Sequence, residues 1–591
     1  MMGVKYLEAM QERLSCEEAR RLQAVYAPQV VGVPPSNAWM DMCAMPDGEI
    51  RHYGHRDGKR VYISSRDGGF TWKEYGVDDL HAMCSGLQSP YSGRWILSYF
   101  VEGEGGFQGA EMPVPPEGAH GWQAVLSDEG PGGAVRWVKI TDKEVRCPRY
   151  PLALRARKRI LIAAQLYERP MRPIVARTDD EGETWQVSCL EGVPMHEPTW
   201  PHEGPRWQNG SCEPTIVERA DGSLLMLTRT SLDFHYQYES FDGGETWTSP
   251  KPSGFHGTLT MPTLLRMHTG EMVLFWCNTQ PLPELDKRKI WPPMNEGEIS
   301  GLGGEDVFTN RDANHAALSL DDGKTWRGFR EVLLNPIRND SDFRTSGGKG
   351  EALDKSVHQF QALEMPYGKI LLSCGQHKYA RRLILLDPKW LLETSREEDF
   401  AYGLESVSTQ VYLKSVSGNR RVRAGHCAWN RTHGAVLMPD PDGNYEEALY
   451  ICANADARLF SPMQGVCWNF PAAHCGKVEI LLQIVEEGVT ATLTDRWFNP
   501  CDAFAGQLSP ISCALSGENC APGKWQRVTL QWDAQGCRVF VEQRLVQTIA
   551  AKYPFPNGLC YLLLQSAPQA SGAQGTFVKS LRMAGEDWAR C

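Results

Sequence analysis

The feature that most constrains the fold of this chain is an eight-residue pattern that returns at long intervals. It reads small hydroxyl residue, any residue, Asp, any residue, Gly, any residue, Thr, Trp. Complete copies run from Ser65 to Trp72, Thr178 to Trp185, Ser240 to Trp247 and Ser319 to Trp326, and a worn copy begins at Ser127. The aspartates stand at positions 67, 128, 180, 242 and 321, so successive copies lie 52 to 79 residues apart. Such a period is typical of a four-stranded propeller blade.

The residue types in the pattern predict a hairpin turn. Asp can accept backbone N–H bonds inside the turn, Gly supplies a left-handed backbone position, and Trp can pack against a neighbouring sheet. Asp followed by Gly between alternating apolar runs is a strong hairpin signal. We therefore expect these residues to hold blades together and to take no part in catalysis.

The patterns are Asp boxes, and over about residues 30 to 400 the chain resembles the sialidase (neuraminidase) superfamily, also called BNR-repeat proteins. The resemblance implies an all-β fold with a six-bladed β-propeller at residues 29–402. Five box positions and a last segment without a box, Val357 to Leu386, account for six blades. A segment rich in Pro and Gly at residues 281–306 is expected to form a long loop over one face.

Two further regions flank the expected propeller. Residues 1–28 should hold one short amphipathic helix, packed on the propeller through Leu7, Met10 and Leu14. Residues 403–591 carry short alternating runs separated by turn clusters, which predict a jelly-roll β-sandwich similar to laminin-G or concanavalin-like lectin domains. Within it, the run from Asp495 to Asp502 is either a sugar platform, a calcium loop or, as we prefer, a packed turn between strands.

Composition excludes several classes of protein. Of the 591 residues, 42% are hydrophobic and 23% charged, which is an ordinary globular mixture. The net charge is −11 and no basic block stands out, so we expect no nucleic-acid partner. No apolar run is long enough for a membrane span, and the charged N-terminus does not resemble a signal peptide. Eighteen Cys therefore predict reduced thiols and a cytoplasmic location of bacterial type.

The same residue counts predict neither a metal site nor a cofactor. Cys and His do not occur at the spacing that metal ligands need. The partner that we expect is a carbohydrate, and a homo-oligomer is left open.

The resemblance also implies site residues. Sialidases hold the substrate carboxylate with three Arg, one each from blades one, four and five, and use a Tyr on blade six as nucleophile, polarised by a Glu on blade four. On that pattern Glu213 and Arg229 fill the blade-four positions, and Arg311 fills the blade-five position. The chemistry is suitable because a guanidinium is always charged and matches a carboxylate with two parallel hydrogen bonds.

Blade one departs from the pattern because no Arg stands at the position where the family carries one. Arg56 is the nearest replacement, in the loop that follows. Asp57 lies roughly where the resemblance places the acid/base Asp, although we prefer to interpret it as an ordinary Asp-Gly turn residue.

Blade six departs as well, because Phe360 falls nearest the position of the Tyr nucleophile and a Phe cannot attack. His358 and Asp354 are the neighbouring residues able to move a proton, and Gln359 lies between His358 and Phe360. Three further residues are expected to line the pocket, namely Trp207, Asn209 and Tyr236.

These departures predict a changed reaction. The favoured hypothesis is an exo-acting glycoside hydrolase that removes a terminal acidic sugar, with Glu213, His358 and Asp57 as catalytic candidates. Two alternatives stay open: a lyase that abstracts a proton beside a uronate carboxylate with His358 as base, and a glycan-binding protein without catalysis.

Overall fold

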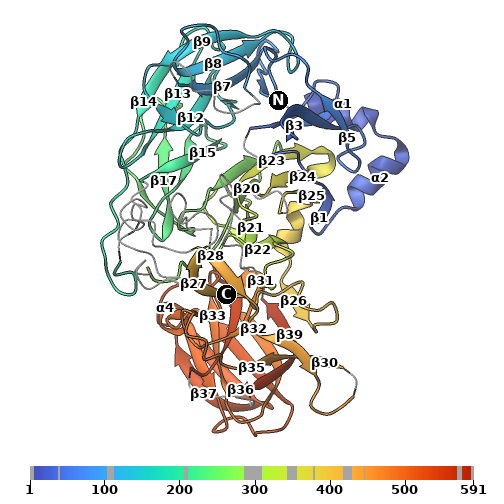
Figure 1. Ribbon diagram of the computed structural model, residues 1–591, viewed down its shortest axis with the longest axis vertical. Coiled ribbons are helices and arrows are strands. Elements are labelled where there is room, and N and C mark those ends of the chain that lie inside the picture. The colour runs from blue at the N-terminus through green and yellow to red at the C-terminus, as the bar shows by residue number, and fades with distance from the viewer. Residues whose placement is uncertain are drawn as a thin grey trace.

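The computed structural model contains six sheets of propeller type, followed by a β-sandwich (Figure 1). The structure describes residues 5–36, 40–102, 112–204, 206, 210–284, 309–341, 356–376, 380–416, 429–444, 446–568 and 575–586. The expected fold class, a propeller followed by a lectin-like sandwich, is confirmed.

The six blades follow one another along the chain as antiparallel sheets. The strands of blades one to three are β2 (Met42–Ala44), β3 (Ile50–Arg56), β4 (Lys59–Ser65) and β5 (Lys73–Gly76); β6 (Leu87–Gln88), β7 (Trp95–Val101), β8 (Gly121–Ser127) and β9 (Arg136–Thr141); and β10 (Val145–Arg146), β11 (Leu152–Ala153), β12 (Ile160–Leu166), β13 (Arg172–Thr178) and β14 (Gln186–Cys189).

Blades four to six continue the series, and the last one is completed by a strand from the beginning of the chain. Their strands are β15 (Cys212–Glu218), β16 (Leu224–Arg229), β17 (Phe234–Ser240) and β18 (Lys251–His256); β19 (Thr263–Arg266), β20 (Met272–Trp276), β21 (Ala313–Ser319) and β22 (Arg327–Leu334); and β23 (Phe360–Met365), β24 (Lys369–Cys374), β25 (Arg382–Leu386) and β1 (Gln29–Gly32). Because β1 pairs with β25, the two ends of the propeller segment meet in one sheet.

Apolar side chains on alternating faces of the strands pack each blade against the two blades beside it. On β20, Met272 and Leu274 face a core shared with blade four, whereas Val273 and Phe275 face a core shared with blade six. This alternation is what a strand buried on both faces requires. Similar buried clusters join blades six and one, one and two, two and three, and three and four.

Each complete Asp box forms the turn between the third and fourth strands of its blade, as expected. In blade four, Asp242 accepts hydrogen bonds from the N–H groups of Glu245 and Thr246, at 3.0 Å each. The indole of Trp247 donates to the carbonyl of Gly244, which has a left-handed φ of 87°. The predicted structural role of the boxes is confirmed.

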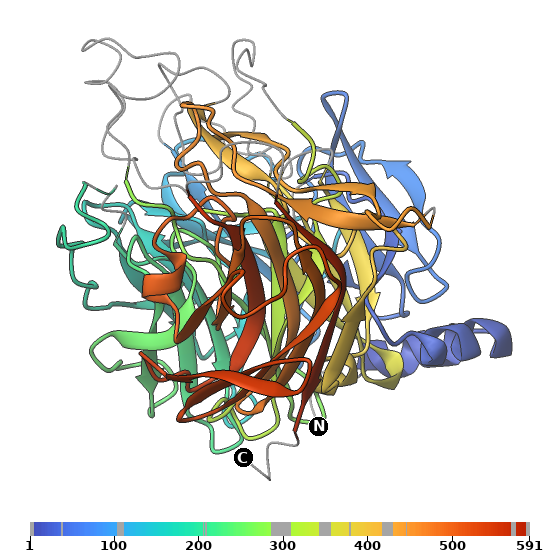
Figure 2. The same ribbon diagram turned by 90° about the horizontal axis from the view of Figure 1, so that it is seen from below.

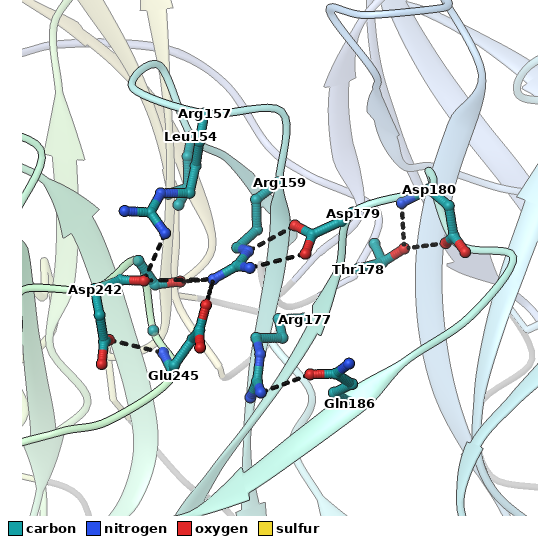
Figure 3. A network of polar contacts seen from close by, with 12 residues as sticks. Leu154, Arg157, Arg159, Arg177, Thr178, Asp179, Asp180, Gln186, Asp242 and Glu245 are labelled. Atoms are coloured by element: carbon teal, nitrogen blue, oxygen red, sulfur yellow. Dashed lines mark hydrogen bonds and ion pairs between the residues drawn. The ribbon is translucent and has the colours of Figure 1, made fainter.

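Two arginine side chains each connect the box of their own blade to the box of the next blade, as Figure 3 shows for Arg159. Arg159, just before β12, donates two hydrogen bonds to Asp179 in its own blade, at 2.7 and 2.8 Å. It also reaches Glu245 and the carbonyl of Gly243 in the following box, at 3.0 Å each. Arg94 repeats this arrangement one blade earlier.

The N-terminal region differs from the single helix that we expected. It forms two helices, α1 (Lys5–Arg13) and α2 (Cys16–Ala24), because Ser15 and Glu18 make a capping box that starts a second helix. Met10 and Leu22 pack into the cluster shared by blades six and one, so the helices do lie on the propeller.

The C-terminal region is a sandwich of two main sheets. One contains β26 (Ser395–Glu398), β29 (Val436–Pro439), β30 (Glu447–Ile451), β32 (Gly476–Ile484), β35 (Gln526–Asp533), β36 (Gly536–Val541), β37 (Arg544–Ala550) and β39 (Thr576–Gly585). The other contains β31 (Gly465–Ala473), β33 (Val489–Thr494), β34 (Ile511–Leu515) and β38 (Leu559–Ser566). We expected the sandwich to begin at residue 403. It begins earlier, because β26 pairs with β39.

Smaller elements complete the described chain. They are the 3₁₀ helices η2 (Pro366–Gly368) and η3 (Pro388–Leu392), the two-stranded hairpin of β27 (Val411–Val416) and β28 (Trp429–Thr432), and the short helix α4 (Ala505–Leu508). Figure 1 shows the hairpin between the propeller and the sandwich, and in the view of Figure 2 the sandwich lies in front of the propeller. None of the helices in the described ranges has the length and apolar character needed to cross a bilayer.

One finding departs from the expectation of reduced thiols. Cys475 takes part in a disulfide bond, whereas fifteen other cysteines of the described part are free.

Candidate active site

The candidate site lies at the end of the propeller opposite the boxes. In every blade the first and third strands begin at this end and the second strand finishes there, because the box follows the third strand. Glu213 stands near the start of β15 and Arg229 at the end of β16, while Arg311 and His358 each come two residues before a strand. Four elements from three blades thus bring these residues to the same end of the ring.

Glu213 and Arg229 form a buried ion pair. The distance from Arg229 Nη1 to Glu213 Oε2 is 2.9 Å, and both residues are less than 10% exposed. The register of β15 against β16 shifts after Cys212, and Glu213 has a φ of 45°. Its N–H donates to Gln165 Oε1 of blade three at 2.9 Å, which fixes this irregular backbone. The predicted return of both side chains to one end of the hairpin is seen directly.

Three guanidinium groups act on the Glu213 carboxylate. Burial alone would raise the pKa of Glu213, but Arg229, Arg311 and Arg149 hold it below its usual value. Glu213 is therefore ionised at neutral pH. An ionised carboxylate can accept a proton or stabilise a nearby positive charge, but it cannot donate a proton.

Arg311 and His358 form the neighbouring part of the site. Arg311 Nη1 lies 3.4 Å from His358 Nδ1, and another of its nitrogens donates to the carbonyl of Leu259. The N–H of Met261 donates to His358 Nε2, so that nitrogen carries no proton and Nδ1 carries it. The contact with Arg311 is then a close approach rather than a hydrogen bond.

Arg149 was missed by the sequence reading. It lies between β10 and β11 and is buried, and it donates to Thr263 Oγ1 at 3.3 Å and to the sulfur of Met261 at 2.8 Å. Burial lowers its pKa, while the charge of Glu213 opposes that effect. We call Glu213, Arg229, Arg311, Arg149 and His358 the hub cluster.

The other predicted site residues have different positions. Gln359 is buried beside His358 with a φ of 72°. Tyr236 lies half-buried on β17, paired with Thr228, and burial raises its pKa.

Arg56 and Asp57 lie at the exposed turn between β3 and β4. Arg56 pairs with Glu74 at 3.2 Å, and Asp57 has a φ of 52°, as a turn residue would. The structure places this turn at the same end of the propeller as the hub cluster but does not bring either side chain to Glu213. Trp207, Asn209 and Asp354 lie outside the described residues.

Phe360 and the segment from Asp495 to Asp502 have structural roles. Phe360 is fully buried in the core between blades five and six. Trp497 forms a β-bridge with Thr279 and accepts a hydrogen bond from Gln280 at 2.8 Å, so its segment packs against blade five. The preferred interpretation of a packed turn is confirmed. No cluster of potential metal ligands occurs among the residues that the structure describes.

Comparison with known protein families supports the assignment of the repeated pattern as Asp boxes. The family described as BNR repeat-like domain matches residues 134–336, a range that contains three of the four complete boxes. The resemblance to BNR-repeat proteins is confirmed on these residues.

Solved structures give weaker likenesses. A protein of unknown function from Dyadobacter fermentans is 15% identical, with a TM-score of 0.37 over 61% of this chain and 97% of that one. The Trypanosoma rangeli sialidase in complex with sialic acid is 11% identical, with a TM-score of 0.31 over 95% and 94% of the two chains. No curated protein matches the sequence.

Proposed function

We propose that the protein is a glycoside hydrolase that removes a terminal acidic sugar from a glycan or glycoside. The observation that carries this proposal is the hub cluster, in which Glu213 pairs with Arg229 and the charges of Arg311 and Arg149 also act on its carboxylate. Guanidinium groups that are buried bind a carboxylate more strongly than exposed ones, because water does not screen the charges. The cluster therefore suits a substrate that brings its own negative charge.

In this proposal the arginines of the hub cluster bind the substrate, and the carboxylates take part in the reaction. Arg229, Arg311 and Arg149 would bind and orient the carboxylate of the sugar. Glu213 would stabilise the positive charge that develops on the sugar ring, or accept a proton from the attacking group. Asp57 is kept as the candidate proton donor, because its turn lies at the same end of blade one.

His358 is better suited to positioning than to proton transfer. Its Nε2 already accepts a hydrogen bond from the N–H of Met261, and the residue is fully buried. A lyase that uses His358 as its base is therefore disfavoured. A glycan-binding protein without catalysis remains the second candidate, because the three arginines would bind an acidic sugar whether or not a bond is broken.

Substitution of Glu213 by Gln separates the two candidates. We would screen the purified protein with aryl glucuronides, aryl sialosides and neutral aryl glycosides, and measure the binding of free glucuronate and N-acetylneuraminate by calorimetry. We expect turnover of an acidic glycoside by the wild type and a loss of about 100-fold or more in Glu213→Gln, with binding retained. Release from the standard sialoside should be slow, because none of the five residues of the hub cluster is a Tyr that could act as the nucleophile.

Glu239→Gln is the matched control. Glu239 also belongs to blade four and pairs with an arginine, Arg219, at 2.7 Å, but it lies on the side of the boxes. It should keep full turnover. Binding of acidic sugars without turnover by the wild type would favour the glycan-binding candidate, and absence of both would refute the proposal.

A further inference from the structure

The hairpin of β27 and β28 belongs to the region after the propeller, yet it contacts the backbone segment that carries Arg311. Tyr412 on β27 and Arg431 on β28 are both fully buried. Their side chains meet Asn310 and Asp312, the residues on either side of Arg311.

The contacts on Asp312 are numerous. Arg431 Nη1 lies 2.6 Å from each carboxylate oxygen, and Asn335 Nδ2 donates to Oδ1 at 2.8 Å. The Asp312 carbonyl also accepts from the N–H of Asn335 at 2.7 Å. A carboxylate held by this many donors in a buried place has one preferred position.

Tyr412 reaches both neighbours of Arg311. Its hydroxyl oxygen is 3.1 Å from Asn310 Oδ1 and 3.1 Å from Asp312 Oδ2. Since a phenol has one proton, it donates to one of these oxygens at a time. Burial and the charge of Asp312 raise the pKa of Tyr412 well above its usual value, so the hydroxyl stays protonated and remains a donor.

The segment that carries Arg311 is also hydrogen-bonded to the segment that carries His358. The carbonyl of Arg311 accepts a hydrogen bond from the N–H of Val357 at 2.9 Å, next to His358. Contacts from the hairpin thus continue through Arg311 to the segment that begins blade six.

We propose that Tyr412 and Arg431 are positioning residues, which hold Arg311 in the orientation that the hub cluster needs for an acidic sugar. The inference rests on the proposed function, and it makes the C-terminal region a part of the site rather than a separate binding module.

Substitution of Tyr412 by Phe is the direct test. It removes the hydroxyl, keeps the ring and leaves no buried charge without a partner. Tyr561→Phe is the matched control, because Tyr561 is also a buried tyrosine of the C-terminal region that donates to a blade-five carboxylate, Glu331, at 2.7 Å. The two variants should lose similar amounts of thermal stability.

Two measurements are made on both full-length variants. Hydrogen–deuterium exchange of the peptides that cover residues 309–313 and 356–360 reports how firmly the Arg311 segment is held. Calorimetry with free glucuronate and N-acetylneuraminate reports the affinity for acidic sugars. We expect faster exchange in these peptides and about 3- to 10-fold weaker binding in Tyr412→Phe, and neither change in Tyr561→Phe.

Two substitutions of Arg431, which pairs with Asp312, add a test by loss and recovery of affinity. Arg431→Gln should weaken binding more than Tyr412→Phe does, and Arg431→Lys should recover part of it because the charge beside Asp312 is restored. Unchanged exchange in Tyr412→Phe would overturn the inference. So would faster exchange with unchanged affinity, or equal losses of affinity in both tyrosine variants.

The proposed function can fail separately. If the wild type binds neither acidic sugar, the function proposed for the hub cluster is refuted, whereas the exchange pattern still decides whether the hairpin holds Arg311.

Discussion

The two ends of the propeller use the same pair of chemical groups in different surroundings. At the box end, Arg159 bridges Asp179 and Glu245, whose carboxylates are largely exposed, and Arg94 repeats the arrangement one blade earlier. At the opposite end, Glu213 and Arg229 are both buried.

The two kinds of pair differ in how strongly their charges interact. At the box end the carboxylates face water, which screens the pairs, so these pairs act mainly by holding neighbouring blades in register. Buried pairs interact strongly, and removal of one partner leaves a charge that is costly to keep inside the protein. We therefore expect substitutions at the box end to change stability, and substitutions at the hub cluster to change ligand binding.

Arg229→Met should give the largest effect. It removes the hydrogen-bonded partner of Glu213, so the pKa of Glu213 should rise and the affinity for glucuronate should fall by about 100-fold or more. Calorimetric titrations between pH 4 and 8 measure both changes. Arg219→Met, on the box side of the same blade, serves as control and should leave the affinity unchanged. Equal effects of the two variants would remove the contrast between the ends.

Arg149→Met should have a smaller effect in the same direction. The charge of Arg149 lowers the pKa of Glu213 less than Arg229 does, so we expect about a 10-fold loss of affinity for glucuronate. The same calorimetric titration measures it. An unchanged affinity would show that Arg149 only supports the packing around Met261 and Thr263.

Arg159→Met should change stability alone. It removes the bridge between two boxes, and we expect the free energy of unfolding to fall by about 1 to 2 kcal/mol. Urea denaturation measures the loss, and binding of glucuronate should stay as in the wild type. A change in binding would mean that the two ends communicate.

Asp242→Asn should give the smallest effect, and one that depends on pH. Burial opposes ionisation of Asp242, but hydrogen bonds from Thr246, Ser240 and Glu245 lower its pKa to about 2. Since the folded pKa is below the unfolded one, the ionised Asp stabilises the protein above about pH 4, and the gain is lost as pH falls toward 2.

Asp242 is half-buried at the edge of the blade, so we expect a loss of about 0.5 to 1 kcal/mol at pH 7 in Asp242→Asn. Urea denaturation at pH 7 and pH 3 should show a smaller difference between variant and wild type at the lower pH. A difference that grows on acidification would contradict the assignment.

The local parts of the fold could be predicted from the sequence, because each box carries its own turn chemistry. Asp, Gly and Trp act within eight residues, so the boxes marked five blades; the sixth blade has no box and was expected from the resemblance to BNR-repeat proteins. The break between α1 and α2 could also have been found, since Ser15 and Glu18 form a capping box that a single amphipathic pattern conceals.

The hub cluster was only partly predictable. Glu213 and Arg229 belong to one hairpin, and the distance along the chain was informative. Arg149 comes from another blade and reaches Glu213 only when the ring is closed. Its own neighbours, in a short connection without a box, gave no signal. Arg56 has the residue type and the loop position expected of a blade-one carboxylate ligand, but its side chain forms an ion pair with Glu74.

Closure of the sixth sheet by β1 has a consequence for how the protein is made. During synthesis, residues 29–32 leave the ribosome early, but their partner strand at residues 382–386 follows more than three hundred residues later. The first strand, which is partly apolar, therefore stays unpaired until the whole ring has been translated, and pairing with another chain is the hazard of that interval.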